Sequence, residues 1–107
     1  MNDQQYVEAA RKLAERMMTE GGADPAARLT FAFRLATSRS PRDPEKAILL
    51  RLLDQHQKDF QADVPAAEKL LTIGEAKRNE TLPPAELAAY TMVANLILNL
   101  DEVVTKE

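Results

Sequence analysis

Residues 24–36 have the sequence DPAARLTFAFRLA, which joins a helix start signal to an almost continuous apolar run. The Asp24 carboxylate can accept a hydrogen bond from the first helical turn, and Pro25 suits the first helical position. Apart from Arg28 and Arg34, the residues that follow are small or apolar on every side of a helix. A helix of this kind is normally buried. We therefore expect residues 25–38 to form the central helix of the domain.

Further helices are predicted on both sides of this segment. Apolar residues recur at intervals of three and four before Gly21, after Asp43-Pro44 and after Pro83-Pro84. A shorter apolar segment ends at Gly74, which suits the left-handed conformation just past a helix end. The predicted fold is all-α, a compact bundle of about five helices at roughly 4–20, 25–38, 44–61, 64–73 and 84–100. The polar residues 74–83 between the last two are expected to form the longest exposed loop.

Length and composition indicate one soluble helical domain over residues 1–107. The chain has 45% hydrophobic and 29% charged residues, which is typical of a globular protein and not of a disordered one. No apolar run approaches the roughly 18 residues of a membrane span, so we expect no membrane insertion. The absence of cysteine excludes disulfides and thiolate metal sites.

Charge is divided unevenly along the chain. Residues 28–51 carry a net charge of +4, whereas residues 59–107 carry −5. We expect a basic layer to lie against an acidic one. Nucleic-acid binding is not expected, because the isoelectric point is near 5.2 and no aromatic residues alternate with the basic ones.

The sequence offers no catalytic, cofactor-binding or metal-binding motif. His56 is the only histidine, and a partly buried helix position explains it better than metal ligation does. Zinc motifs, phosphate-binding glycine loops and nucleophile elbows are all absent from the sequence. We therefore assign no catalytic residue, no metal ligand and no cofactor.

Four charged residues are predicted to form a structural pairing. Arg34 lies within an apolar segment, and an unpaired buried arginine would cost several kcal/mol. Asp101 and Glu102 follow the last predicted helix, where acids oppose the helix dipole. We predict that Asp101 or Glu102 pairs with Arg34 or Arg28 and fixes the C-terminal segment across the second helix. The alternative is that both acids are simply solvated.

Four segments of the chain together carry a resemblance to a known family. They are Tyr6-Val7-Glu8-Ala9-Ala10-Arg11, Arg28-Leu29-Thr30-Phe31-Ala32-Phe33-Arg34-Leu35-Ala36-Thr37, Pro84-Ala85-Glu86-Leu87-Ala88-Ala89-Tyr90 and Asn99 to Glu107. The strongest part is Asn99-Leu100-Asp101-Glu102. In their order and spacing, over nearly the whole chain, these segments resemble the planctomycete proteins with domain of unknown function 1553. The resemblance implies that this chain is the C-terminal part of a larger exported protein.

The family also implies partners for this domain. In its members the domain follows a second domain of unknown function, and often a c-type cytochrome-like domain, in one polypeptide. The haem-attachment pattern Cys-x-x-Cys-His is absent from this chain, so no redox role is carried over. Where the family commonly has glycine after the second helix, this chain has Ser38, and a left-handed turn there would cost on the order of 1 kcal/mol.

The expected function is a non-catalytic structural or interaction module of an extracytoplasmic protein. Its expected partners are the upstream domains of the same polypeptide, and its oligomeric state is left open. The lost interface is expected on the first helix and around Tyr90. One alternative is a ligand-binding or enzymatic site shared with those domains, in which the basic face from Arg39 to Arg51 binds an anionic glycan. A standalone cytoplasmic regulator is a third possibility.

Overall fold

The structure is a computed structural model that describes residues 3–74 and 77–100 of the chain. Within those residues it contains five α-helices and no strand, which confirms the predicted all-α fold. The helices are α1 (Asp3–Glu20), α2 (Pro25–Thr37), α3 (Asp43–Ala62), α4 (Val64–Leu71) and α5 (Pro84–Leu98). None of the helices in the described part of the chain is long and apolar enough to cross a membrane.

Local capping explains where α2, α3 and α4 begin. The Asp24 carboxylate accepts a hydrogen bond from the Ala27 N–H at 3.2 Å, as the sequence predicts, and Asp63 caps α4 in the same way through Ala66. At α3 the capping residue is Arg42 and not Asp43. The reason is that the Glu45 carboxylate turns back and accepts the Arg42 N–H at 2.8 Å, which leaves Asp43 within the first turn.

The helix ends also follow local chemistry, although three helices are shorter than predicted. Ser38 ends α2 with φ 66° and ψ 16°, in the left-handed region, and its N–H donates to the Arg34 carbonyl. Gly74 has φ 97°, which confirms the left-handed glycine after α4. The Leu100 N–H donates to the Ile97 carbonyl at 3.2 Å, three residues back and not four, so α5 ends at Leu98 and not at Leu100.

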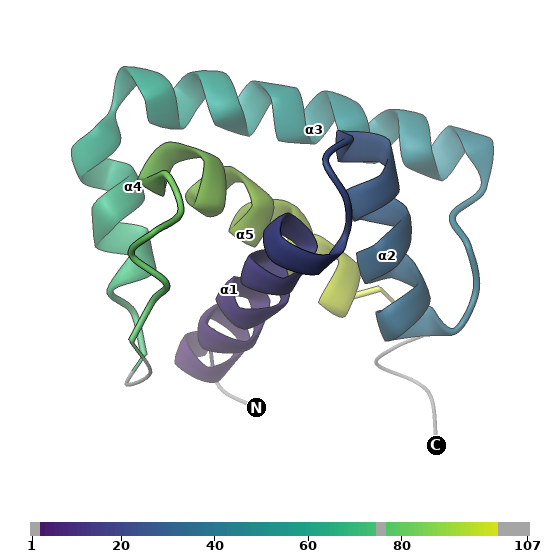
Figure 1. Ribbon diagram of the computed structural model, residues 1–107, viewed down its shortest axis with the longest axis horizontal. Helices are drawn as coiled ribbons and strands as arrows, with labels where there is room; N and C mark the ends of the chain where they lie inside the picture. Colours follow the sequence, from purple (N-terminus) through teal and green to yellow (C-terminus); the bar gives the residue numbers. More distant parts are fainter. Residues whose placement is uncertain (1–2, 75–76, 101–107) are drawn as a thin grey trace.

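The central helix is α5, and the prediction that α2 is central is wrong. In Figure 1, α5 runs below α3 and behind α1, and it packs against all four other helices. Its buried residues occupy every side of the helix: Leu87, Ala88, Ala89, Tyr90, Thr91, Val93, Ala94 and Ile97. Because no charged residue occurs from Leu87 to Leu100, burying this helix desolvates no charge.

The α2 helix lies at the edge of the bundle. It buries only Leu29, Ala32 and Phe33, while Leu35 on its outer side is 49% exposed. The prediction was wrong because it relied on the apolar content of the helix. Apolar residues on the outer side of a helix raise that content as much as core residues do. The two arginines of α2 make its complete burial costly.

The connection between α4 and α5 is exposed or half-buried in all its described residues from 74 to 83, and it contacts α1 at two points. The Asn79 N–H donates to Oε2 of Glu15 at 2.7 Å. A Cβ atom on Gly74 would lie 3.0 Å from the Glu8 side chain, so the chain passes close to α1 at both points. Arg78 between them is half-buried.

Candidate functional site

Arg28 has more contacts than Arg34, the other residue of the predicted structural pairing that the structure describes. Its guanidinium donates to four groups: Nε to the Gly22 carbonyl at 2.8 Å, Nη1 to Oε2 of Glu86 at 3.4 Å and to the Tyr90 hydroxyl at 3.3 Å, and Nη2 to the Met18 carbonyl at 3.4 Å. The guanidinium carbon also lies 5.4 Å from the centre of the Tyr90 ring. This one side chain therefore joins the end of α1 and the start of α2 to α5.

Glu86 is the carboxylate that pairs with Arg28 in the described part of the chain. The Arg28 side chain is 15% exposed and that of Glu86 is 37% exposed, so the pair is partly shielded from water. Sequence spacing does not indicate this contact, because 58 residues separate the two positions. The packing of α2 across the first turn of α5 brings them together.

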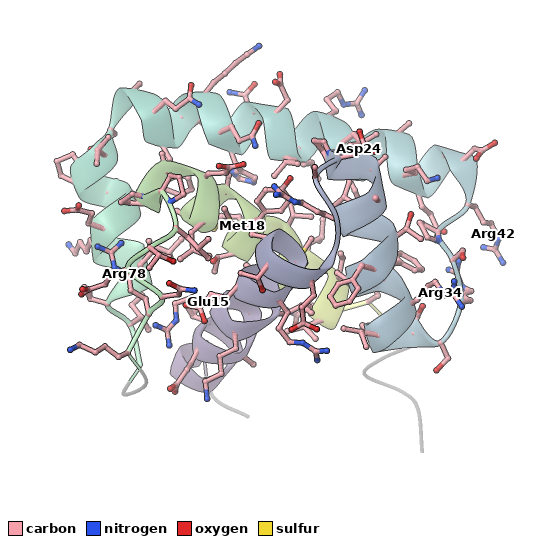
Figure 2. All side chains as sticks on the ribbon, in the orientation of Figure 1. Glu15, Met18, Asp24, Arg34, Arg42 and Arg78 are labelled. Carbon is pink, nitrogen blue, oxygen red and sulfur yellow. The ribbon has the colours of Figure 1, made fainter. Side chains whose placement is uncertain are left out.

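Arg34 is exposed and makes no ion pair with any residue that the structure describes. Figure 2 shows it at the lower end of α2, near the connection to α3. Because its guanidinium is solvated, the burial argument that motivates a partner for it does not apply. Asp101 and Glu102 lie outside the described residues, so their pairing with Arg28 or Arg34 stays a prediction.

A second arginine, Arg39, is part of a link between α2 and α3 that the sequence analysis misses. Nη1 and Nη2 of Arg39 donate to both carboxylate oxygens of Glu45, at 3.0 and 2.9 Å. The guanidinium also lies 4.8 Å from the centre of the Phe33 ring. Hydrogen bonds from Arg39 and then from the Arg42 N–H lower the pKa of Glu45 to about 2.

An apolar hollow lies where α2, α3 and α5 meet. Its volume is about 180 Å³, and it is lined by Phe33, Glu45, Ile48, Leu49, Leu96 and Leu100. Two of these side chains remain open to solvent, Ile48 at 48% and Leu96 at 41%. The hollow thus presents an apolar floor with uncovered apolar edges.

A second hollow between α3 and α5 adjoins the first at Leu96, which lines both. Its volume is about 410 Å³, and its other lining residues are Leu52, His56, Met92, Val93, Asn95 and Asn99. The polar groups here are the His56 ring, stacked on Phe60 with centroids 6.4 Å apart, and two carboxamides. Nδ2 of Asn99 donates to the Asn95 carbonyl at 2.7 Å, so it is occupied within α5. We call the two hollows together the α3–α5 groove.

Tyr90 and α1 do not form the exposed interface that the sequence analysis expects. Tyr90 is fully buried, and α1 contributes no large exposed hydrophobic side chain among the described residues. The α1 helix instead buries Arg11, which is 1% exposed. Its position explains this burial, because Arg11 follows the core residue Ala10 and precedes Ala14 by three positions on the same side of the helix.

Metal chemistry is not suggested by the side-chain arrangement. Across the described residues, no three or more His, Asp or Glu side chains gather as metal ligands would. The groove offers apolar surface and amide groups, which suit the binding of another protein segment.

Comparison with known protein families gives a match that covers slightly less than half of the chain. Residues 1–53 match the model of PSD1, a protein of unknown function (DUF1553). The resemblance to the DUF1553 family is thereby confirmed over α1, α2 and the first half of α3. No curated protein and no solved structure matches the chain. The DUF1553 match includes the α3 wall of the groove as far as Leu52, whereas α5 lies beyond it.

Proposed function

We propose that this chain is a non-catalytic packing module that binds other domains of its own polypeptide through the α3–α5 groove. The observation that carries the proposal is the partial exposure of Leu96, at 41%, on a helix that has no charged residue from Leu87 to Leu100. A helix apolar on all sides is normally covered on all sides. The last turns of α5 lack such a cover in the groove.

The shape of the groove supports a helical or extended segment as its occupant. Its α3 wall runs from Glu45 to His56, which spans roughly 17 Å at 1.5 Å per residue. That length matches about three turns of an amphipathic helix laid between α3 and α5. The resemblance to exported proteins in which this domain follows others supports a partner within the same polypeptide and an extracytoplasmic location.

The alternative site for an anionic glycan receives less support from the geometry. It relies on the basic face from Arg39 to Arg51, and Arg39 is already bound to both oxygens of Glu45. Arg42 and Arg51 stay exposed, but Asp43 and Glu45 lie beside Arg42 at the same helix start. We therefore favour protein packing over glycan binding.

A calorimetric titration tests the proposal. The 1–107 chain is titrated with the adjoining domains of its parent polypeptide, expressed separately, and then the titration is repeated with Leu96→Asp. Because a buried charge has no partner in an apolar groove, we expect binding to weaken by at least about tenfold. Val64→Asp is the matched control, since Val64 on α4 is also 41% exposed and lies outside the groove.

Three results bear on the proposal. Loss of affinity in Leu96→Asp alone supports it. Absence of heat change with the unmodified chain contradicts it, as does equal weakening by Leu96→Asp and Val64→Asp.

A further inference from the structure

The outer face of α2 forms a second uncovered surface, distinct from the groove. It consists of Ala27, Thr30, Phe31, Arg34 and Leu35, which line an open hollow of about 480 Å³. These positions lie opposite the buried Leu29, Ala32 and Phe33 on the helix. Leu35 is the most exposed large hydrophobic residue in the described part of the chain, at 49%. Phe31 packs partly against the core and has the Arg16 guanidinium 5.6 Å from the centre of its ring, whereas Leu35 is left half exposed.

The apolar stripe on this face has a centre and two unequal ends. Phe31 lies four residues after Ala27 and four residues before Leu35, so the three side chains follow one line along the helix. If a second α2 is laid antiparallel with Phe31 opposite Phe31, each Leu35 faces an Ala27. A large side chain then meets a small one on both sides of a two-fold axis, as an isologous contact requires.

Charged residues also differ between the two ends of α2. Asp24 lies at the start of α2 and Arg34 near its end, as Figure 2 shows. The Arg16–Glu20 pair of α1 lies beside the middle of this face, because the Arg16 guanidinium is 5.6 Å from the centre of the Phe31 ring, and its two opposite charges offset each other. Arg34 makes no ion pair with the described residues. An antiparallel pairing brings each Arg34 towards the acidic end of the other helix.

We propose that this face is a homodimer contact, in which α2 packs antiparallel on α2 of a second copy about a two-fold axis at Phe31. The occupant is a second copy because the face is complementary to itself in both size and charge. A single pair of 13-residue helices buries less than the roughly 1,200 Å² of a standard interface, so the dimer is weak. The proposal does not depend on the groove or on any other domain.

Sedimentation equilibrium of the 1–107 chain alone tests for the dimer. Over a range of about 10 μM to 1 mM, we expect the average mass to rise from one chain towards two. Leu35→Asp should remain monomeric throughout, whereas Val64→Asp should behave like the unmodified chain. A mass that stays at one chain for the unmodified protein overturns the proposal, and so does dimerisation of Leu35→Asp.

Charge reversal tests the orientation. Arg34→Glu should weaken dimerisation by about fivefold or more, because like charges then meet at both ends of the contact. The double variant Arg34→Glu with Asp24→Arg restores opposite charges and should recover most of the affinity. Failure of the double variant to recover contradicts the antiparallel arrangement, provided that its circular dichroism spectrum shows a folded chain.

Disulfide trapping tests the register directly, because the chain contains no native cysteine. We expect a mixture of Ala27→Cys and Leu35→Cys chains to cross-link to each other on mild oxidation. Each variant alone should cross-link poorly, because identical positions lie roughly 12 Å apart along the antiparallel pair, beyond the reach of a disulfide. Equal cross-linking of the single variants and the mixture would refute the proposed register.

Discussion

Arg28 and Glu86 join α2 to α5 through a hydrogen bond of 3.4 Å between Nη1 and Oε2, across 58 residues of sequence. The same guanidinium also donates to the Met18 carbonyl in the last turn of α1 and to the Gly22 carbonyl in the connection that follows. Three helices therefore share one cation. The position of the edge helix α2 depends on this residue, because α2 buries only three side chains of its own.

Replacing Arg28 should destabilise the fold. We expect Arg28→Met to lower the free energy of unfolding by about 2 kcal/mol, since the substitution leaves two carbonyls and the Tyr90 hydroxyl without their donor. Urea denaturation followed by circular dichroism measures this change. Arg16→Met is the control, because the Arg16–Glu20 pair is exposed on both sides and should contribute little. Equal effects of the two variants would contradict the role of Arg28.

Ser38 holds a left-handed conformation that glycine adopts at lower cost. We expect Ser38→Gly to raise the free energy of unfolding by about 1 kcal/mol, because φ is 66° at this position. Ser40→Gly serves as the control, since Ser40 has no positive φ and glycine there only adds freedom to the unfolded chain. Thermal unfolding of both variants would show opposite shifts in Tm. A lower Tm for Ser38→Gly would be inconsistent with strain at this turn.

The Arg39–Glu45 pair predicts a pH dependence of stability in acid. The pKa of Glu45 is about 2 in the folded protein, below the ordinary value of 4.5. The ionised carboxylate therefore stabilises the fold above about pH 4.5, and this contribution is lost as the pH falls from 4.5 towards 2. We expect the stability difference between the unmodified chain and Glu45→Gln to shrink across this window. Asp and Glu side chains titrate between about pH 6 and 2.5. A stability difference that stays constant over this range would contradict a stabilising role of the ionised Glu45 carboxylate.

Gly21 allows a close approach between the end of α1 and the start of α2. A Cβ atom at this position would lie 2.6 Å from the Met17 carbonyl oxygen and 3.1 Å from the Arg28 Cα. Both neighbours are backbone atoms that cannot turn aside. We expect Gly21→Ala to lower the free energy of unfolding by roughly 1–3 kcal/mol, measured by urea denaturation. An unchanged midpoint would mean that α1 and α2 can separate there without cost.

Local structure could be predicted from the sequence because its causes are local. Asp24-Pro25 marks the start of α2, and Gly74 marks the turn after α4, since capping and left-handed turns depend on a few adjacent residues. The order of helices in space was not predictable in the same way. Periodicity shows which residues share a face, but it does not show whether that face meets the core, as Phe31 and Leu35 on α2 demonstrate.

The contacts of the candidate site also depend on how the helices pack, which the sequence does not show. The apolar surroundings of Arg34 single out that residue and not Arg28, and the pairing of Arg28 with Glu86 depends on how α2 crosses α5. The groove likewise depends on Ile48 from α3 lying near Leu96 from α5. In the sequence both positions look like ordinary core positions, so the pattern does not show that they stay exposed. Arg11 gives one signal that the sequence does contain, because it occupies a core position of α1.

The central claim, that the α3–α5 groove binds an adjoining domain, is tested most directly by NMR. The isotope-labelled 1–107 chain is titrated with the separately expressed adjoining domains of its parent polypeptide, and the methyl signals of Ile48, Leu52, Met92 and Leu96 are followed. The account predicts that these signals shift or broaden together while that of Val64 stays unchanged. Binding that perturbs other surfaces and leaves the groove methyls unaffected would contradict the account.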